Sequence, residues 1–209
     1  MAYFKSCKFV SRGGDEYQLD LDLNDEAIMR NHVEFVVAGT VRKGASGRTI
    51  HAQFTVRLNV PDNRIEVIHQ DQIVGTIYLA RPDINQVADV DEPETLQLRE
   101  HIDNTWERIC AFLEEGGRES IERIIDNIPA VDPVFGCLIR AALSTAIGQL
   151  LKCYAQDRPI EEDLRHREGE INRRRQAMRV LECLKNNLLA IGSRFAMRFW
   201  KCFAFGGIF

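Results

Sequence analysis

The sequence lacks the short motifs that usually reveal an enzyme or a secreted protein. It contains no CxxC pair, no GxGxxG loop and no phosphate-binding loop ending in GK[ST]. Nucleotide chemistry therefore has no support, and we predict no cofactor. The first 20 residues lack the long apolar core and small-residue cleavage site of a secretory signal. We therefore expect a reducing, cytoplasmic location, with a peripheral membrane location as the alternative.

Cysteine is present but is not arranged as a disulfide framework. Most of the six cysteines lie in apolar stretches with helical periodicity, where thiols pack as small hydrophobic groups. In a cytoplasmic chain such thiols stay reduced, so we predict no disulfide bond. The cysteines are Cys7, Cys110, Cys137, Cys153, Cys183 and Cys202.

Metal-binding and catalytic patterns are weak throughout. The spacing of Asp20, Asp22 and Asn24 matches the start of a calcium-binding loop, but the sixth position is Asp25 where such a loop has glycine. The acids also alternate with apolar residues, as expected for the solvent-facing side of a strand. Three further residues, Glu162, His166 and Glu170, are spaced four residues apart and would share a helix face. This arrangement is more typical of a solvated charge pair than of a metal site. The motif-like run at 44–47 is one residue short of GxSxG and predicts a hairpin turn. We predict no catalytic or metal-ligating residues.

The N-terminal half alternates between apolar and polar residues. From 49 to 60 the alternation is strict, and short turns separate five strand-like runs at 17–23, 32–41, 49–60, 64–68 and 73–79. This pattern predicts an antiparallel meander of four or five strands in a domain spanning 1–90. The residues expected to face the core are Ile50, Phe54, Val56 and Leu58, and those expected to face away are His51, Gln53, Thr55 and Arg57.

The rest of the chain, 91–209, is predicted to form a helical bundle, which makes the fold class α+β. Spacings of three and four residues predict helices on either side of a stop at Gly116 and Gly117. The run from Val134 to Tyr154 approaches the length of a membrane span. Because Arg140 lies within it, a helix buried in the bundle is the better interpretation.

The C-terminal segment differs in charge from the rest of the chain. Residues 171–209 hold eight basic residues and one acidic residue, a net charge of +7; since the whole chain carries −4, the remainder carries −11. From 181 to 202 an apolar arc and a basic side predict a cationic amphipathic helix. The residues predicted to contact a partner or membrane are Arg194, Phe195, Arg198, Phe199, Trp200, Lys201 and Phe203.

These features favour a non-enzymatic interaction or adaptor protein that acts through its helical half. In that interpretation the last helix packs in the bundle, the acids of 100–115 offset its arginines, and the partner is another protein or a second copy of the chain. The first alternative is a membrane-associating, membrane-permeabilising effector that uses the cationic aromatic helix on anionic lipid. The second alternative is nucleic-acid binding through Arg173, Arg174 and Arg175.

Overall fold

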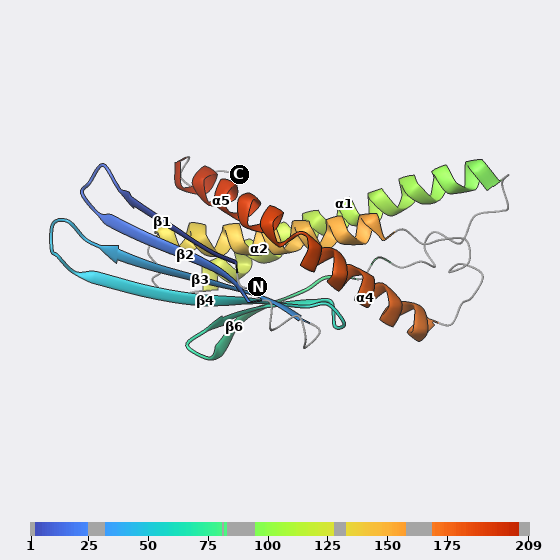
Figure 1. Ribbon diagram of the computed structural model, residues 1–209, viewed down its shortest axis with the longest axis horizontal. Helices are drawn as coiled ribbons and strands as arrows, with labels where there is room; N and C mark the ends of the chain where they lie inside the picture. The colour runs from blue at the N-terminus through green and yellow to red at the C-terminus, as the bar shows by residue number, and fades with distance from the viewer. Residues whose placement is uncertain are drawn as a thin grey trace.

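The structure is a computed structural model, and it describes residues 3–24, 32–80, 82, 95–127, 133–157 and 169–204. Glu162 and His166 lie outside these ranges. In Figure 1 the chain forms two layers, a twisted sheet and a group of helices that lies on one face of it. The predicted α+β class is confirmed.

The sheet is an antiparallel meander in which every strand pairs with its neighbour in sequence. Its six strands are β1 (Tyr3–Val10), β2 (Glu16–Asn24), β3 (His32–Arg42), β4 (Thr49–Asn59), β5 (Arg64–His69) and β6 (Gln72–Tyr78). The predicted meander is therefore confirmed and extends by one strand, β1, beyond the five runs recognised in the sequence. The run at 44–47 is the β3–β4 hairpin turn, with Gly47 at a φ of 63°.

The alternation in β4 assigns its two faces as predicted. Phe54, Val56 and Leu58 are at most 2% exposed and Ile50 packs at the edge of the core, whereas the residues between them face away from it. A slip of one residue would have reversed every side chain, so this register is the one that hydrophobic burial requires.

Four described helices follow the sheet: α1 (Thr95–Asn127), α2 (Pro133–Gln156), α4 (Gly169–Asn186) and α5 (Leu188–Ala204). The predicted stop at Gly116 and Gly117 is wrong, because α1 continues through both glycines. A Cβ atom on Gly117 would lie 3.1 Å from Ile147 of α2 and 3.5 Å from Leu79. The absence of a side chain allows α1 to pass close to its neighbours, which a helix stop would have prevented.

Helix α2 is the central helix. It contacts α1, α4, α5, β3 and β4, and sixteen of its 24 residues are buried. Gly39 on β3 leaves room for the ring of Phe135, which would collide with any larger residue there. By length and composition α2 could cross a membrane, but 78% of its most apolar window is buried inside the protein. This burial agrees with the interpretation of α2 as a bundle helix.

A buried polar network joins the two layers. The Tyr154 hydroxyl of α2 donates to Asn63 Oδ1 at 3.0 Å, and Asn63, in the β4–β5 turn, donates its side-chain amide to the Leu79 carbonyl. Trp106 of α1 donates its indole N–H to the Tyr154 carbonyl at 2.7 Å. One hydrophobic core runs continuously through the sheet and the helices. The sheet and helical halves thus pack as one body, whether or not each could fold alone.

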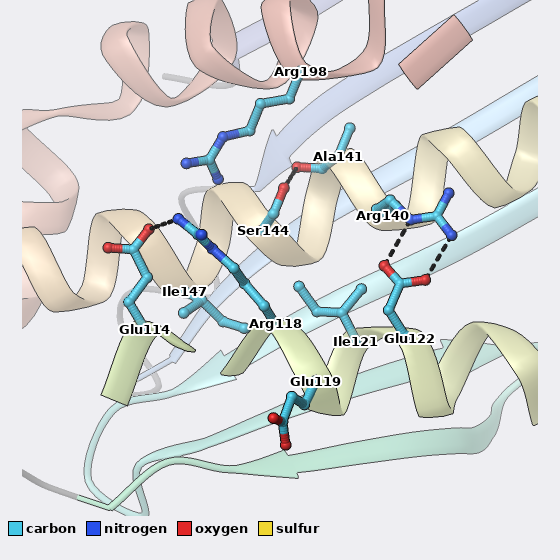
Figure 2. A pocket seen from close by; sticks show the side chains of 10 residues that line it. All are labelled: Glu114, Arg118, Glu119, Ile121, Glu122, Arg140, Ala141, Ser144, Ile147 and Arg198. Atoms are coloured by element: carbon cyan, nitrogen blue, oxygen red, sulfur yellow. Dashed lines mark hydrogen bonds and ion pairs between the residues drawn. The ribbon is translucent and has the colours of Figure 1, made fainter. Parts of the chain in front are cut away.

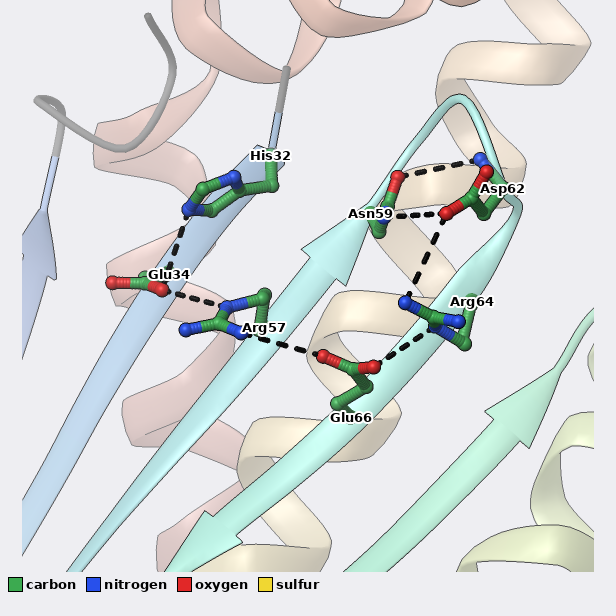
Figure 3. Close-up of polar contacts among 7 residues, drawn as sticks. All are labelled: His32, Glu34, Arg57, Asn59, Asp62, Arg64 and Glu66. Carbon is green, nitrogen blue, oxygen red and sulfur yellow. Dashed lines mark hydrogen bonds and ion pairs between the residues drawn. The ribbon is translucent and has the colours of Figure 1, made fainter. Parts of the chain in front are cut away.

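The face of the sheet away from the helices carries a row of charged side chains, drawn in Figure 3. Arg57 lies between two acids: its Nε donates to Glu34 Oε1 at 2.8 Å and its Nη1 lies 3.6 Å from Glu66 Oε2. Glu66 also pairs with Arg64 Nε at 2.9 Å, although its side chain is only 6% exposed. The row continues to His32 at one end and Asp62 at the other. Opposite charges alternate along the row from Glu34 to Asp62.

Candidate functional site

Helix α5 holds all seven residues predicted to contact a partner, and its apolar arc is buried in this structure. Phe195 is 8% exposed and Phe199 is 3% exposed, and Ile191 and Cys202 are buried beside them. At ~100° per residue these positions fall on one side of the helix, which packs against α2 and the edge strand β1. The two phenylalanines are therefore core residues here.

The end of α5 carries an aromatic cluster. The rings of Phe199, Trp200 and Phe203 lie 6.0 Å apart from one another, and Tyr17 of β2 packs on Phe203 at 6.1 Å. Trp200 remains 42% exposed, so the cluster is buried on one side and open on the other. This packing anchors the end of α5 to the sheet and leaves one indole at the surface.

The outward side of α5 is apolar and basic together. Leu189 is 70% exposed and Met197 is 54% exposed, and with Trp200 and Lys201 they lie opposite the buried arc. Ile171 and Met178 extend the exposed apolar set onto α4. These two helices thus carry half of the ten large hydrophobic residues exposed in the described part of the chain.

The remaining two predicted residues, Arg194 and Arg198, lie on the flank of α5 that faces α2. Arg194 Nη1 donates to Oε1 of the buried Gln149 at 2.6 Å. Arg198 is half-buried, and its Nη1, which solvent does not reach, has no hydrogen-bond partner among the residues that the structure describes. The two arginines therefore differ: Arg194 donates to a neutral buried amide, whereas the buried Nη1 of Arg198 has no acceptor among the described residues.

Arg198 extends into a half-open cavity of about 570 Å³ that lies between α1, α2 and α5 (Figure 2). Across this cavity Arg140 forms a two-point contact with Glu122, with Nη2 to Oε2 at 2.7 Å and Nε to Oε1 at 2.9 Å. Arg118 donates to Glu114 at 3.2 Å. The other lining residues are Glu119, Ile121, Ala141, Ser144 and Ile147.

Electrostatics distinguish the cavity arginines. The hydrogen bonds to Glu122 raise the pKa of Arg140 above its ordinary value, against the opposing effect of burial. Burial lowers the pKa of Arg198, and the charges of Arg194 and Arg118 lower it further, while Glu114 acts in the opposite direction. Arg140 thus sits where its charge is favoured, and Arg198 sits where its charge is disfavoured.

The prediction that no cysteines are paired is wrong. Disulfides join Cys137 to Cys202 and Cys153 to Cys183, with Cα atoms 5.5 and 5.8 Å apart. Periodicity placed these thiols correctly on packing faces, but it could not show that the faces oppose one another at bonding distance. The prediction of reduced thiols assumed a cytoplasmic location, and that location itself stays a prediction.

Cys110 behaves as predicted for a structural thiol. It is 7% exposed, and burial, helped by the charge of Glu107, raises its pKa to about 11. Such a thiol is almost entirely protonated near neutral pH and is a poor nucleophile. The side chain of Cys7 lies outside the described set.

Within the described ranges no group of three or more His, Cys, Asp or Glu side chains is placed to hold a metal ion. Asp20 lies on the sheet face away from the helices, where it accepts a weak hydrogen bond from Gln18. Glu162 and His166 lie outside the described residues, and the charge pair with Glu170 stays a prediction.

The cavity itself was missed in the sequence, apart from Arg198. Its acidic residues follow ordinary helical spacing and look like a solvated surface of α1. One signal was available: Arg140 in the most apolar segment of the chain requires an acidic partner, which the structure identifies as Glu122.

Comparison of the chain with protein-family models, with curated protein sequences and with solved structures gives no match.

Proposed function

We propose that this protein is a non-enzymatic interaction protein whose contact surface is the outward side of α4 and α5, and that the surface it meets is an anionic membrane. The observation that carries the proposal is the exposure of Leu189, Met197 and Trp200 beside basic residues. Exposed apolar groups among cations are typical of a helix that lies in a bilayer interface.

Charge complementarity supports an anionic occupant. Arg173, Arg174 and Arg175 are exposed on α4, Lys185 follows near its end, and Lys201 is exposed on α5. Glu182 is the one acid in 171–209. Each basic residue near an anionic bilayer contributes about 1 kcal/mol, and the apolar side chains add to this when they insert.

The proposed contact does not require the phenylalanine arc to leave the core. Phe195 and Phe199 are packed against α2, and the Cys137–Cys202 disulfide ties α5 to that helix. We therefore propose that the folded protein binds peripherally through its outward side chains. Permeabilisation of the bilayer would require the buried arc, so it is the less favoured form of the membrane hypothesis.

Flotation with liposomes tests the proposal. Vesicles of phosphatidylcholine with 30% phosphatidylserine should carry the protein at low salt, and pure phosphatidylcholine vesicles should not. The double change Leu189→Ser with Trp200→Ser removes two exposed apolar groups and should weaken binding about tenfold. The control is Val10→Ser with Tyr78→Ser, which alters an aliphatic and an aromatic residue that are 66% and 74% exposed on the two edge strands of the sheet.

Two results would overturn the membrane assignment. Absence of flotation with anionic vesicles at any salt concentration would leave a protein partner or self-association as the interaction. Binding to a duplex oligonucleotide but not to vesicles would favour the nucleic-acid alternative, which rests on the three consecutive arginines of α4. Equal binding by the α5 double variant and the sheet-edge control would exclude the outward side of α5 as the contact surface.

A further inference from the structure

The acidic residues that line the cavity between α1, α2 and α5 already have basic partners. Glu122 is held at two points by Arg140, Glu114 accepts from Arg118, and Glu119 lies 3.5 Å from Arg123. No described acid forms an ion pair with Arg198. Three acids and three arginines line the cavity, and Arg198 is the one of these arginines that forms no ion pair with a described acid.

The position of Arg198 depends on a glycine of α2. A Cβ atom on Gly148 would lie 3.1 Å from Arg198 Nη2, which is closer than most Cβ contacts, and 3.5 Å from Nη1. Because Gly148 has no side chain, the guanidinium reaches the backbone of α2, where solvent no longer contacts Nη1. A half-buried cation with an unsatisfied donor is destabilising unless another group neutralises it.

We propose that this cavity is a binding site for a small organic anion whose carboxylate or phosphate group is bound by Arg198. A guanidinium presents paired N–H donors that match the oxygens of either group. Arg118, which also donates to Glu114, lines the same cavity from α1 and provides a second cation near the bound group (Figure 2).

The size and lining of the cavity define the class of ligand. About 570 Å³ lies in the middle of the range of ~300 to 1,000 Å³ found for small-molecule sites. Ile121, Ala141 and Ile147 provide an apolar wall next to the basic group. The preferred ligand thus carries one anionic head and a short apolar body. This inference is independent of the membrane proposal, because its residues face the cavity and not the outward side of α5.

Calorimetric titration with two probes tests the site. Inorganic phosphate and hexanoate are titrated separately into the full chain at constant ionic strength, with chloride as the competing background anion. We expect saturable binding of at least one probe, together with a rise in melting temperature. Arg198→Gln should weaken this binding at least about tenfold. Lys201→Gln, a charge removed from the outward side of the same helix, should leave it unchanged.

A second variant separates binding from folding. Gly148→Ala places a methyl group against the guanidinium, which is the flexible end of its side chain, so the fold should be retained while anion affinity falls several-fold. Binding of hexanoate alone assigns the head group as carboxylate, and binding of phosphate alone assigns it as phosphate. The proposal is wrong if neither probe binds saturably, or if Arg198→Gln and Gly148→Ala both bind as tightly as the unmodified protein.

Discussion

The ion-pair row on the sheet and the cavity between the helices both contain several arginines, but they differ in how completely those arginines are paired. On the sheet, Arg57 and Arg64 share Glu66, and each has a second acid nearby. In the cavity Arg140 forms an ion pair with Glu122, whereas Arg198 forms none with any acid that the structure describes. A fully paired charge is explained by the fold alone. An unpaired one suggests a role that the fold does not supply.

The largest effect is expected when the ion-pair row on the sheet loses its central acid, Glu66. Glu66→Gln keeps the shape but leaves Arg57 and Arg64 without their shared acid, and Glu66 is only 6% exposed. We expect the free energy of unfolding to fall by about 2 to 3 kcal/mol, measured by chemical denaturation. Glu16→Gln, in an exposed pair with Arg42, is the control and should change it by less than about 0.5 kcal/mol. Equal effects of the two variants would show that burial of the row is unimportant.

The next largest effect is expected at a neutral buried group, the hydroxyl of Tyr154, which hydrogen-bonds between the two layers. Tyr154→Phe removes the hydroxyl that donates to Asn63 and leaves that amide oxygen unsatisfied between the layers. We expect a loss of about 1 to 2 kcal/mol in the free energy of unfolding. Tyr78→Phe, at a residue that is 74% exposed, should have almost no effect. If Tyr154→Phe left the free energy of unfolding unchanged, the packing of the sheet against the helices would not depend on this hydrogen bond.

Removing the unpaired arginine of the cavity should change the free energy of unfolding in the opposite direction. Arg198→Leu removes an unsatisfied cation and should raise the free energy of unfolding by about 1 kcal/mol in buffer without anionic ligands. This corresponds to a rise in melting temperature of roughly 2 to 4 °C. Arg140→Leu, made on the paired arginine of the same cavity, should instead lower the melting temperature. Destabilisation by both changes would show that Arg198 is a structural residue.

The smallest effect is expected on the outward side of α5. Lys201→Gln alters an exposed residue, so the free energy of unfolding should change by less than about 0.5 kcal/mol. Flotation with anionic vesicles should nevertheless weaken, and the difference from the unmodified protein should shrink as salt rises. A salt-independent difference would argue against an electrostatic contact.

Much of the fold could be predicted because burial imposes a period on the sequence. The strict alternation of β4 gave its buried face, and the steps of three and four in α5 gave its buried arc. Strand β1 was missed because the apolar and basic residues of its sequence, YFKSCKFV, do not alternate regularly. Edge strands carry less of the core pattern, so their sequence signal is weaker.

Long-range pairing was beyond the reach of periodicity. The Cys137–Cys202 bond and the Glu122–Arg140 contact join residues on different helices, and helical spacing cannot show which faces oppose one another. The same reason hid the cavity. The seven residues predicted on α5 share one helix, but the structure divides them among the core, the cavity and the outer surface.

The meander topology has a consequence for the order in which the chain folds. Every strand pairs with the one before it, so each hairpin closes a short loop and the sheet can assemble step by step. During synthesis the sheet emerges first, while α1 and α2 still await translation. Until those helices arrive, the face with Val37, Val56 and Leu58 has no cover. The nascent chain is therefore most prone to aggregation between the completion of β6 and the docking of α2.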